Sequence, residues 1–320
     1  MKLRKKALLP AIAMVLASVI ALSGVTYAWF TTGNTANVQA LDVNVATASG
    51  IQVSLDAASW KSTIKAEDFV TAVSGNKVTI QYPMGDAEIL PVSSAGQILR
   101  DDEGNSTGKM AMFYGMINKD GTLYSASEVE KNTTSEGNFV AFDLYFKSST
   151  ANQPLTLKMG DTASYVKGIN LAERDENGEI KTTEIGTEKA VRVAFVLFDG
   201  ATSSVTTARD NTSISDIKIW EPHSTSRANG VPEGTEDDKA LSYLGFNQGF
   251  ESCIVEDLAT NGYASEVTTF DDEQDMLTLQ PGINKMRVYI WLEGQDVDCV
   301  NDISFGDFRV NLFFSVPGEE

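Results

Sequence analysis

Hydrophobic and polar residues alternate one by one along most of this chain. In segment 138–149 the alternation places Val140, Phe142, Leu144 and Phe146 on one face. A period of two is typical of half-buried β-strands, whereas the apolar positions of an amphipathic helix recur about every 3.6 residues. The same pattern predicts strong strands at 189–200, 284–296 and 308–316, and further strands at 38–45, 51–55, 78–82, 154–159, 214–220 and 276–281.

Turn residues rather than helices separate these strands. Asn177-Gly178 and Asp120-Gly121 are dipeptides typical of tight β-hairpins, and Gly75-Asn76 is a weaker example. Helical periodicity is confined to short pieces at 125–132 and 238–245. Many strands without a βαβ rhythm predict an all-β protein, and we expect an antiparallel two-sheet sandwich, jelly-roll-like, with long polar loop insertions.

Residues 201–275 are rich in Ser, Thr, Asp, Glu and Gly and form the main candidate insertion. Strong strands lie on both sides of this region, which favours one sandwich domain over residues 29–320. Two domains divided by the polar region are the alternative.

The N-terminus has the layout of a secretory signal. Four basic side chains between residues 2 and 6 precede an apolar run from Ala7 to Val25. Thr26 and Ala28 are small enough for the pockets of a signal peptidase, so the pattern predicts a signal-peptide helix at 1–28 that is cleaved before Trp29. A cleaved chain has no stable membrane insertion. The alternative is a retained anchor, since the run reaches the lower range for spanning a bilayer.

Charge narrows the range of partners. The formal net charge is −19, and removing residues 1–28 makes it more negative because that segment holds four basic and no acidic residues. Nucleic-acid binding needs clustered Lys and Arg, and an anionic membrane surface would repel this chain. The composition favours a soluble extracellular protein that attracts cations.

No catalytic constellation stands out in the sequence. There is a single histidine, His223, in a polar segment, and neither a G-x-S-x-G nor an H-E-x-x-H motif occurs. A nucleophilic Ser or Cys usually needs a positioned His as its base. We therefore expect a protein that is not an enzyme, with a hydrolase built on two carboxylates as the least favoured alternative.

Two features are candidate sites. Glu293, Asp296, Asp298 and Asp302 are close together after a predicted strand, and oxygen ligands at this density could hold Ca²⁺, which is the candidate cofactor. The alternative is a solvated turn. Cys253 and Cys299 are a candidate disulfide for an exported chain, and the alternative is two separate thiols.

Two short blocks resemble known sequences. The block GVTYAWFTTGNTA, residues 24–36, is similar to the signal-peptide junction of the TasA/camelysin group of secreted bacterial proteins, which a SipW-type signal peptidase processes. This resemblance covers about residues 1–45. It implies secretion, and TasA-like proteins are jelly-roll sandwiches that polymerise by N-terminal strand addition. The block IWLEGQDVDCVND, residues 290–302, resembles a W-L-E-G-x-D-x-x-C block of clostridial-type hypothetical secreted proteins.

Together these features predict a secreted, non-enzymatic protein of the bacterial cell surface or biofilm matrix, with itself or matrix proteins as partners. The candidate strand-addition segment has apolar residues at Phe30, Val38, Ala40, Val43 and Val45. Its alternative role is the first strand of its own domain. The alternative function is a carbohydrate- or host-ligand-binding module, for which the candidate stacking residues are Trp60, Trp220, Tyr243 and Trp291.

Overall fold

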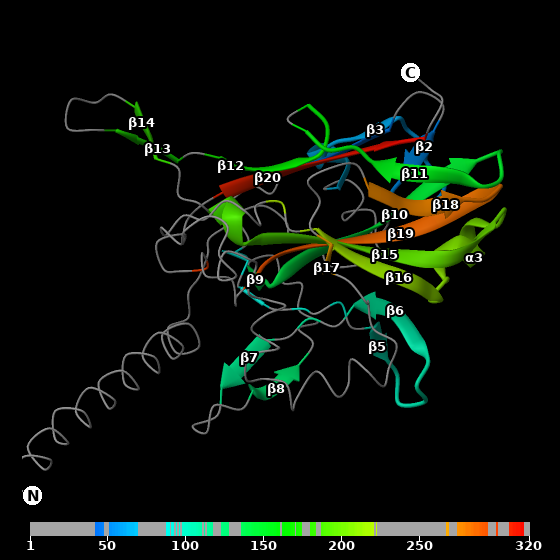
Figure 1. Ribbon diagram of the computed structural model, residues 1–320, viewed down its shortest axis with the longest axis horizontal. Coiled ribbons are helices and arrows are strands. Elements are labelled where there is room, and N and C mark those ends of the chain that lie inside the picture. The colour runs from blue at the N-terminus through cyan, green and yellow to red at the C-terminus, as the bar shows by residue number, and fades with distance from the viewer. Residues whose placement is uncertain are drawn as a thin grey trace, which may run out of the picture.

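β-Strands dominate the protein, which we describe from a computed structural model (Figure 1). The all-β prediction is confirmed. Short helical pieces include η1 (Thr187–Ala190) and α3 (Val205–Arg209). In the described part of the chain, no helix is both long and apolar enough to cross a membrane. The described residues are 42–47, 51–69, 88–89, 91–92, 94, 96, 98–110, 112, 114–117, 123–127, 136–160, 162–169, 171–174, 180–183, 187–220, 222, 267–268, 274–293, 299 and 307–316.

One layer of the sandwich, sheet A, contains the first and the last described strands. Its order is β18-β11-β20-β1-β3, and β12 also pairs with β20. β1 runs parallel to β20, from the pair Asp42↔Arg309 to the pair Thr47↔Phe314, whereas the other pairs are antiparallel. The strands are β1 (Asp42–Thr47), β3 (Thr63–Ile64), β11 (Gln153–Leu157), β12 (Tyr165–Ile169), β18 (Gln274–Leu279) and β20 (Asp307–Ser315).

The other layer, sheet B, contains the longest strands in the order β17-β16-β15-β19-β10-β2. Its pairs are antiparallel except β16–β17. The strands are β2 (Gln52–Ser54), β10 (Phe139–Ser148), β15 (Val191–Thr202), β16 (Ile214–Trp220), β17 (Val267–Thr268) and β19 (Gly282–Leu292). β16 lies inside the predicted polar insertion at 201–275, so part of that region belongs to the sandwich itself.

Four two-stranded pairs complete the described strands. In two of them the predicted hairpins are confirmed, because antiparallel strands flank the Asp120-Gly121 and Asn177-Gly178 dipeptides. The predicted helical piece at 125–132 is wrong at its start, since residues 125–127 are in β8. The strands are β4 (Glu88–Ile89) with β9 (Glu136–Gly137), β5 (Ile98–Arg100) with β6 (Ser106–Met110), β7 (Tyr114–Ile117) with β8 (Leu123–Ser127), and β13 (Leu171–Arg174) with β14 (Ile180–Thr183).

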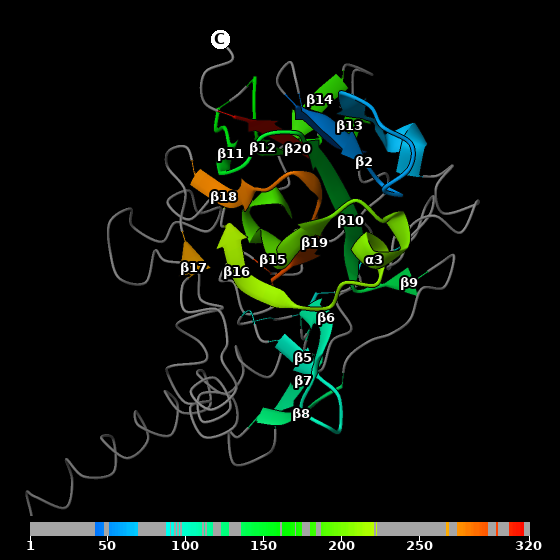
Figure 2. The ribbon, with the colours of Figure 1, turned by 90° about the vertical axis from the view of Figure 1, so that its right-hand side faces the viewer.

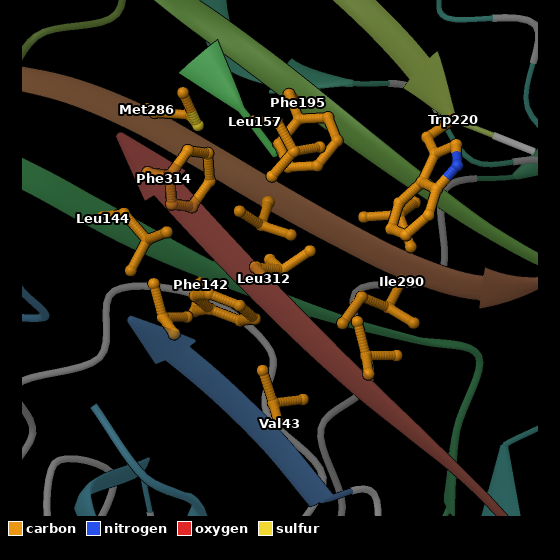
Figure 3. Packing of buried hydrophobic residues seen from close by; sticks show 14 of the residues in the cluster. Val43, Phe142, Leu144, Leu157, Phe195, Trp220, Met286, Ile290, Leu312 and Phe314 are labelled. Atoms are coloured by element: carbon orange, nitrogen blue, oxygen red, sulfur yellow. The ribbon is translucent and has the colours of Figure 1, made fainter. Parts of the chain in front are cut away.

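Alternate side chains of both sheets fill the space between them (Figure 3). Phe142 of β10, Phe195 of β15 and Phe314 of β20 are completely buried there. The ring of Phe314 lies edge-on to Phe195 and Phe146, with centroids 6.3 and 5.2 Å apart. Edge-to-face pairs of this kind add about 0.5–1.5 kcal/mol to the area that they bury. The alternation that predicted the strands therefore also identifies the core.

Sheet B is apolar on its outer face as well. A second cluster on that face includes Ala194, Tyr289 and Trp291, and Met110 from β6 packs against it. Figure 2 shows the β5–β6 pair on the side of sheet B that faces away from sheet A. A strand that is buried on both faces has no clear polar side, which explains why all of residues 139–146 are buried.

Hydrogen bonds close both sides of the sandwich. On one side, Val53 of β2 and Lys61 exchange two main-chain bonds of 2.8 and 2.9 Å, and the Thr47 amide donates to the Ser62 carbonyl at 3.0 Å. On the other side, Lys218 Nζ of β16 donates to the Asp275 carbonyl of β18 at 2.7 Å. The two sheets are therefore held together at their edges as well as through their core.

The connection of the strands differs from the expected sandwich in its parallel pairs. We expected antiparallel neighbours throughout, but the short pairs β16–β17 and β4–β9 are parallel, and β1 joins β20 in parallel over six residue pairs. A parallel neighbour cannot be reached by a tight hairpin, so this contact brings together the two ends of the described chain. The two-sheet sandwich is confirmed, whereas the jelly-roll order stays a prediction.

Candidate functional site

Several predicted site residues lie outside the described residues. They are the signal residues Thr26, Ala28 and Trp29, the arm positions Phe30, Val38 and Ala40, the acidic positions Asp296, Asp298 and Asp302, and Cys253 with His223 and Tyr243. Signal cleavage, a disulfide and a calcium site therefore stay predictions. Within the described residues, no group of three or more His, Cys, Asp or Glu is placed to hold a metal ion.

Val43 and Val45 are the two described residues of the predicted strand-addition segment. Both are in β1, and both are completely buried in the core between the sheets. β1 pairs with all but the ends of β20, but with β3 only at Val45 and Ala46. These two valines therefore occupy the first described strand of this chain's own sandwich, the role that we gave as the alternative.

Glu293 is a buried residue rather than part of a solvated turn. Its side chain is 0% exposed, and one carboxylate oxygen accepts a 3.0 Å hydrogen bond from the indole N–H of Trp291. Its amide donates to the Ala190 carbonyl at 2.8 Å. The end of β19 thus continues by one residue into a bridge with Val92. This placement corrects the solvated-turn alternative at Glu293.

The remaining predicted residues mostly belong to the core. Cys299 is 6% exposed and is part of the cluster between the sheets. Trp220 and Trp291 are 3% and 0% exposed, which contradicts a role as open platforms for a sugar ring. Trp60 is half-buried, and the ammonium of Lys147 lies 5.6 Å from the centroid of its ring.

Four polar side chains lie together on the outer face of sheet B, and the sequence did not single them out. This charge cluster consists of Asp143 and Tyr145 of β10 with Lys285 and Arg287 of β19. In the strand register Asp143 lies opposite Arg287, and Tyr145 opposite Lys285. Even the most exposed of the four, Arg287, is only 6% accessible. Charges buried to this degree persist only when they are paired.

Asp143 is the centre of the charge cluster. Arg287 donates from Nε and Nη2 to its two carboxylate oxygens at 2.6 and 3.1 Å. The Tyr145 hydroxyl donates to Oδ2 at 3.2 Å, and Lys285 Nζ lies 3.6 Å from the same oxygen. A two-pronged guanidinium–carboxylate pair is among the strongest polar contacts in proteins. One carboxylate thus balances two cations inside the protein.

The two cations also reach beyond sheet B. Lys285 Nζ donates to the carbonyl oxygens of Arg209, the last residue of the helix α3, and of Asn211, each at 2.8 Å. Arg287 Nη1 donates to the carbonyl of Gly108 in β6. The charge cluster therefore ties α3 and the β5–β6 pair to the outer face of sheet B.

Burial and charge set the protonation of the charge cluster. Burial is the largest influence on Lys285 and lowers its pKa, against the attraction of Asp143. Burial would also lower the pKa of Arg287, but the charge and hydrogen bonds of Asp143 raise it above its usual value. For Tyr145, burial first and then the negative charge of Asp143 raise the pKa, so its hydroxyl keeps the proton that it donates.

This arrangement suits a structural role better than a chemical one. A lysine nucleophile needs a neutral amine. All the contacts of Lys285 Nζ named above are with carbonyl or carboxylate oxygens, which accept hydrogens from an ammonium group. The ring of Phe198 also lies 4.5 Å below this cation, which favours its charged form.

Another buried carboxylate, that of Asp56, holds the turn after β2. Asp56 accepts hydrogen bonds from the amides of Ala58 and Ser59 and from the hydroxyls of Ser54 and Ser59. Burial alone would raise the pKa of Asp56, but these four hydrogen bonds outweigh it and lower the pKa from 3.8 to about 2. Its carbonyl oxygen accepts from the guanidinium of Arg209, so this turn also anchors α3.

We expect Asp56→Asn to lower the free energy of unfolding near pH 6. Because the pKa of the folded state lies below that of the unfolded chain, the charged carboxylate stabilises the fold above about pH 4 and loses this effect as pH falls toward 2. The difference between variant and native protein should therefore shrink over this range in urea unfolding followed by circular dichroism. Asp102→Asn, an exposed control, should change stability by less than about 0.5 kcal/mol. A difference that stays constant down to pH 2 would contradict the assignment.

Among the residues that the structure describes, two hollows lie at the ends of strands. One, of about 270 Å³, is open between the two sheets and is called the end pocket; it is lined by Ile51, Gln52, Lys147, Ser148, Ser149, Thr150, Gln153, Leu279 and Val316. The other, of about 530 Å³, lies between the end of β15, helix α3 and the start of β19, with Lys285 among its lining residues. Asp199 and Asp210 are among the residues that line this second hollow, so a hydrolase built on two carboxylates stays a prediction that the described residues do not test.

Comparisons of the chain with protein-family models, with curated proteins and with solved structures give no match. The fold and its contacts therefore define the protein only by class. It is an all-β sandwich in which sheet B, the sheet with the longest strands, is buried on both faces and carries an internal charge cluster.

Proposed function

We propose that this protein is a secreted, non-enzymatic structural protein of the bacterial cell surface or biofilm matrix, which assembles with copies of itself by N-terminal strand addition. The observation that carries the proposal is the place of β1. This strand follows the predicted arm, pairs in parallel with β20, and puts Val43 and Val45 into the core between the sheets.

A strand in this position is well suited to come from a neighbouring chain. It joins β20 through main-chain hydrogen bonds and alternate side chains, the two features that give strand addition its affinity and its register. No hairpin links β1 to β20, because parallel neighbours need a longer connection. The route from β1 to the rest of the described fold runs through residues 48–50 alone, and these include Gly50.

The edge of sheet A also offers room for a further strand. β3 covers β1 only at Val45 and Ala46, so within the described residues the stretch from Asp42 to Asn44 has no partner strand on that side. An uncovered edge presents unpaired N–H and C=O groups to another chain. Strand addition can therefore act through exchange of β1 or through the arm that precedes it.

Removing residues 29–40 from the secreted chain is expected to abolish fibres without unfolding the protein, because β1 is kept. Electron microscopy of negatively stained samples measures the first effect and circular dichroism the second. The matched control replaces residues 29–40 by a Gly/Ser segment of equal length, which keeps the length of the arm but removes its apolar positions. Fibres that persist in either variant would contradict addition through the arm, and a native secreted chain that forms no fibres would contradict assembly.

A further inference from the structure

We propose that the larger hollow, of about 530 Å³ between the end of β15, helix α3 and the start of β19, binds a cationic amino sugar, a sugar ring that carries a protonated amine. The inference goes beyond the proposed function, since it concerns a small ligand on one copy of the chain and does not depend on assembly. It is carried by the volume, the polar lining and the charge of the hollow.

An irregularity in β15 helps to form the hollow. The register of β15 against β19 passes from the pair Leu197↔Met286 to the pair Ala201↔Asn284, so residues 198–200 lie opposite Lys285 alone. Figure 2 looks onto this end of the sandwich, where α3 lies beside β15 and β19. The volume is within the roughly 300–1,000 Å³ that is usual for small-molecule sites.

Hydrogen-bonding groups dominate the lining of the hollow. Among the described residues, the side chains of six exposed lining residues form no hydrogen bond with the protein; they are Asp199, Thr206, Thr207, Asp210, Thr212 and Ser213. No aromatic residue is in the described lining. A ligand here is therefore recognised through hydrogen bonds and charge rather than by stacking on a ring.

The charge of the hollow favours a cation. Asp199 and Asp210 are exposed, whereas Lys285, the one basic residue of the described lining, is 3% exposed. Its ammonium is held by Asp143, whose attraction is stronger than that of Asp210, and by two carbonyl oxygens. The positive charge is thus balanced inside the protein, and the two carboxylates set the charge that a ligand meets.

The backbone that carries the two carboxylates is fixed. The Asp199 amide donates to the Ser213 carbonyl at 2.9 Å, and the Asp199 carbonyl accepts from Asn211 Nδ2 at 2.9 Å. Lys285 Nζ binds the carbonyl oxygens on both sides of Asp210, each at 2.8 Å. A ligand meets groups that are already in place, which lowers the cost of ordering them on binding.

The hydroxyls of the hollow narrow the class of cation. Thr206, Thr207, Thr212 and Ser213 can each donate one hydrogen bond and accept others. The methylene groups of a polyamine have no use for these partners, whereas the hydroxyls of a sugar ring do. A metal ion fits less well, since within the described residues no group of three or more His, Cys, Asp or Glu is placed to hold one.

Isothermal titration calorimetry on the full secreted chain tests the inference. The probe is a β-1,4-linked tetramer of glucosamine at pH 5.5 in 0.15 M salt, conditions under which its amines are charged. Asp199→Asn with Asp210→Asn should weaken binding by at least about tenfold, because both charges are lost while the shape is kept. The matched control, Asp102→Asn with Glu103→Gln, removes two exposed carboxylates that do not line the hollow. It should change the dissociation constant by less than about twofold, since this salt screens charges beyond about 8 Å.

Two further ligands separate the amine from the sugar. The N-acetylated tetramer keeps the rings without the charge, and spermidine keeps the charge without the rings. Both should bind at least about tenfold more weakly than the glucosamine tetramer. Thr206→Val with Thr212→Val keeps the shape of the lining, and should weaken binding of the tetramer about three- to tenfold while leaving that of spermidine unchanged. Circular dichroism should show the fold of every variant unchanged.

Each contrary result removes a particular part of the inference. A native chain that does not bind the glucosamine tetramer would overturn it entirely. Equal losses from the two pairs of acidic substitutions would show a non-specific attraction to an acidic chain, and the hollow would not be the site. Equally tight binding of the N-acetylated tetramer would contradict the role of the amine, and equally tight binding of spermidine would contradict the sugar. The fibre experiment uses no ligand, so its result and this one are independent.

Discussion

Asp143→Ala is expected to lower the free energy of unfolding by about 3–5 kcal/mol, the usual cost of breaking a buried ion pair by removing one partner. In this protein the carboxylate balances two cations, since Arg287 binds it with two hydrogen bonds and Lys285 lies 3.6 Å away. Removing it leaves Arg287 without the carboxylate that it binds, and leaves Lys285 with only the weaker attraction of Asp210. Urea unfolding at pH 7, followed by tryptophan fluorescence, measures the loss.

A double variant separates the charge effect from the loss of packing. Asp143→Leu with Arg287→Met removes both partners of the strongest pair and keeps most of their volume. The losses from Asp143→Leu alone and from Arg287→Met alone are measured in the same way and added. We expect the double variant to be more stable than this sum predicts, by about 0.5–3 kcal/mol, because the partners are in direct contact. Strict additivity, or a loss below about 1 kcal/mol for Asp143→Ala, would contradict the role of the charge cluster.

The two-sheet fold could be predicted from the sequence because alternation directly reports which side of a strand is buried. In segment 138–149, the alternate positions Phe142, Leu144 and Phe146 do lie between the sheets. The Asn-Gly and Asp-Gly turns were equally informative, since each demands a local backbone geometry that few dipeptides adopt. These signals are local, and they give strand positions without giving strand neighbours.

The outer face of sheet B and its charge cluster were missed for a physical reason. Asp143, Lys285 and Arg287 occupy the positions that alternate with the core, and charged residues at such positions usually face water. The signal that could have found them is the type of residue that shares their face of the strand. Tyr289 and Trp291 are on the same outward face, and large aromatics repeated there indicate a second buried layer.

The parallel contact of β1 with β20 could not be predicted from either strand alone. Its six pairs join residues more than 260 positions apart, and period-two strands are compatible with parallel and antiparallel neighbours alike. The depth of Glu293 was missed in a similar way. The residues that follow it, Gly294 to Asp296, are those of a solvated turn, but Glu293 itself forms a bridge with Val92, a contact that only the fold creates.

Phe314→Ala is expected to lower the free energy of unfolding by about 3–5 kcal/mol, as other deletions of a buried phenyl ring do. Phe314 is completely buried and lies edge-on to two rings of sheet B, so the cavity cannot close without moving strands that are fixed by their ladders. The neighbouring residue supplies a matched control. Phe313 carries the same side chain in the same strand, but it is half-buried on the other face of sheet A.

Phe313→Ala should cost less than half of what Phe314→Ala costs, because part of its ring already contacts water in the folded state. Thermal unfolding by circular dichroism, with both variants in the same buffer, gives the comparison directly. The ratio of the two losses reports the register of β20, since shifting a strand by one residue moves every side chain to the opposite face. Equal losses, or a larger loss for Phe313→Ala, would mean that sheet A faces sheet B with its other side, and the core between the sheets would be wrong.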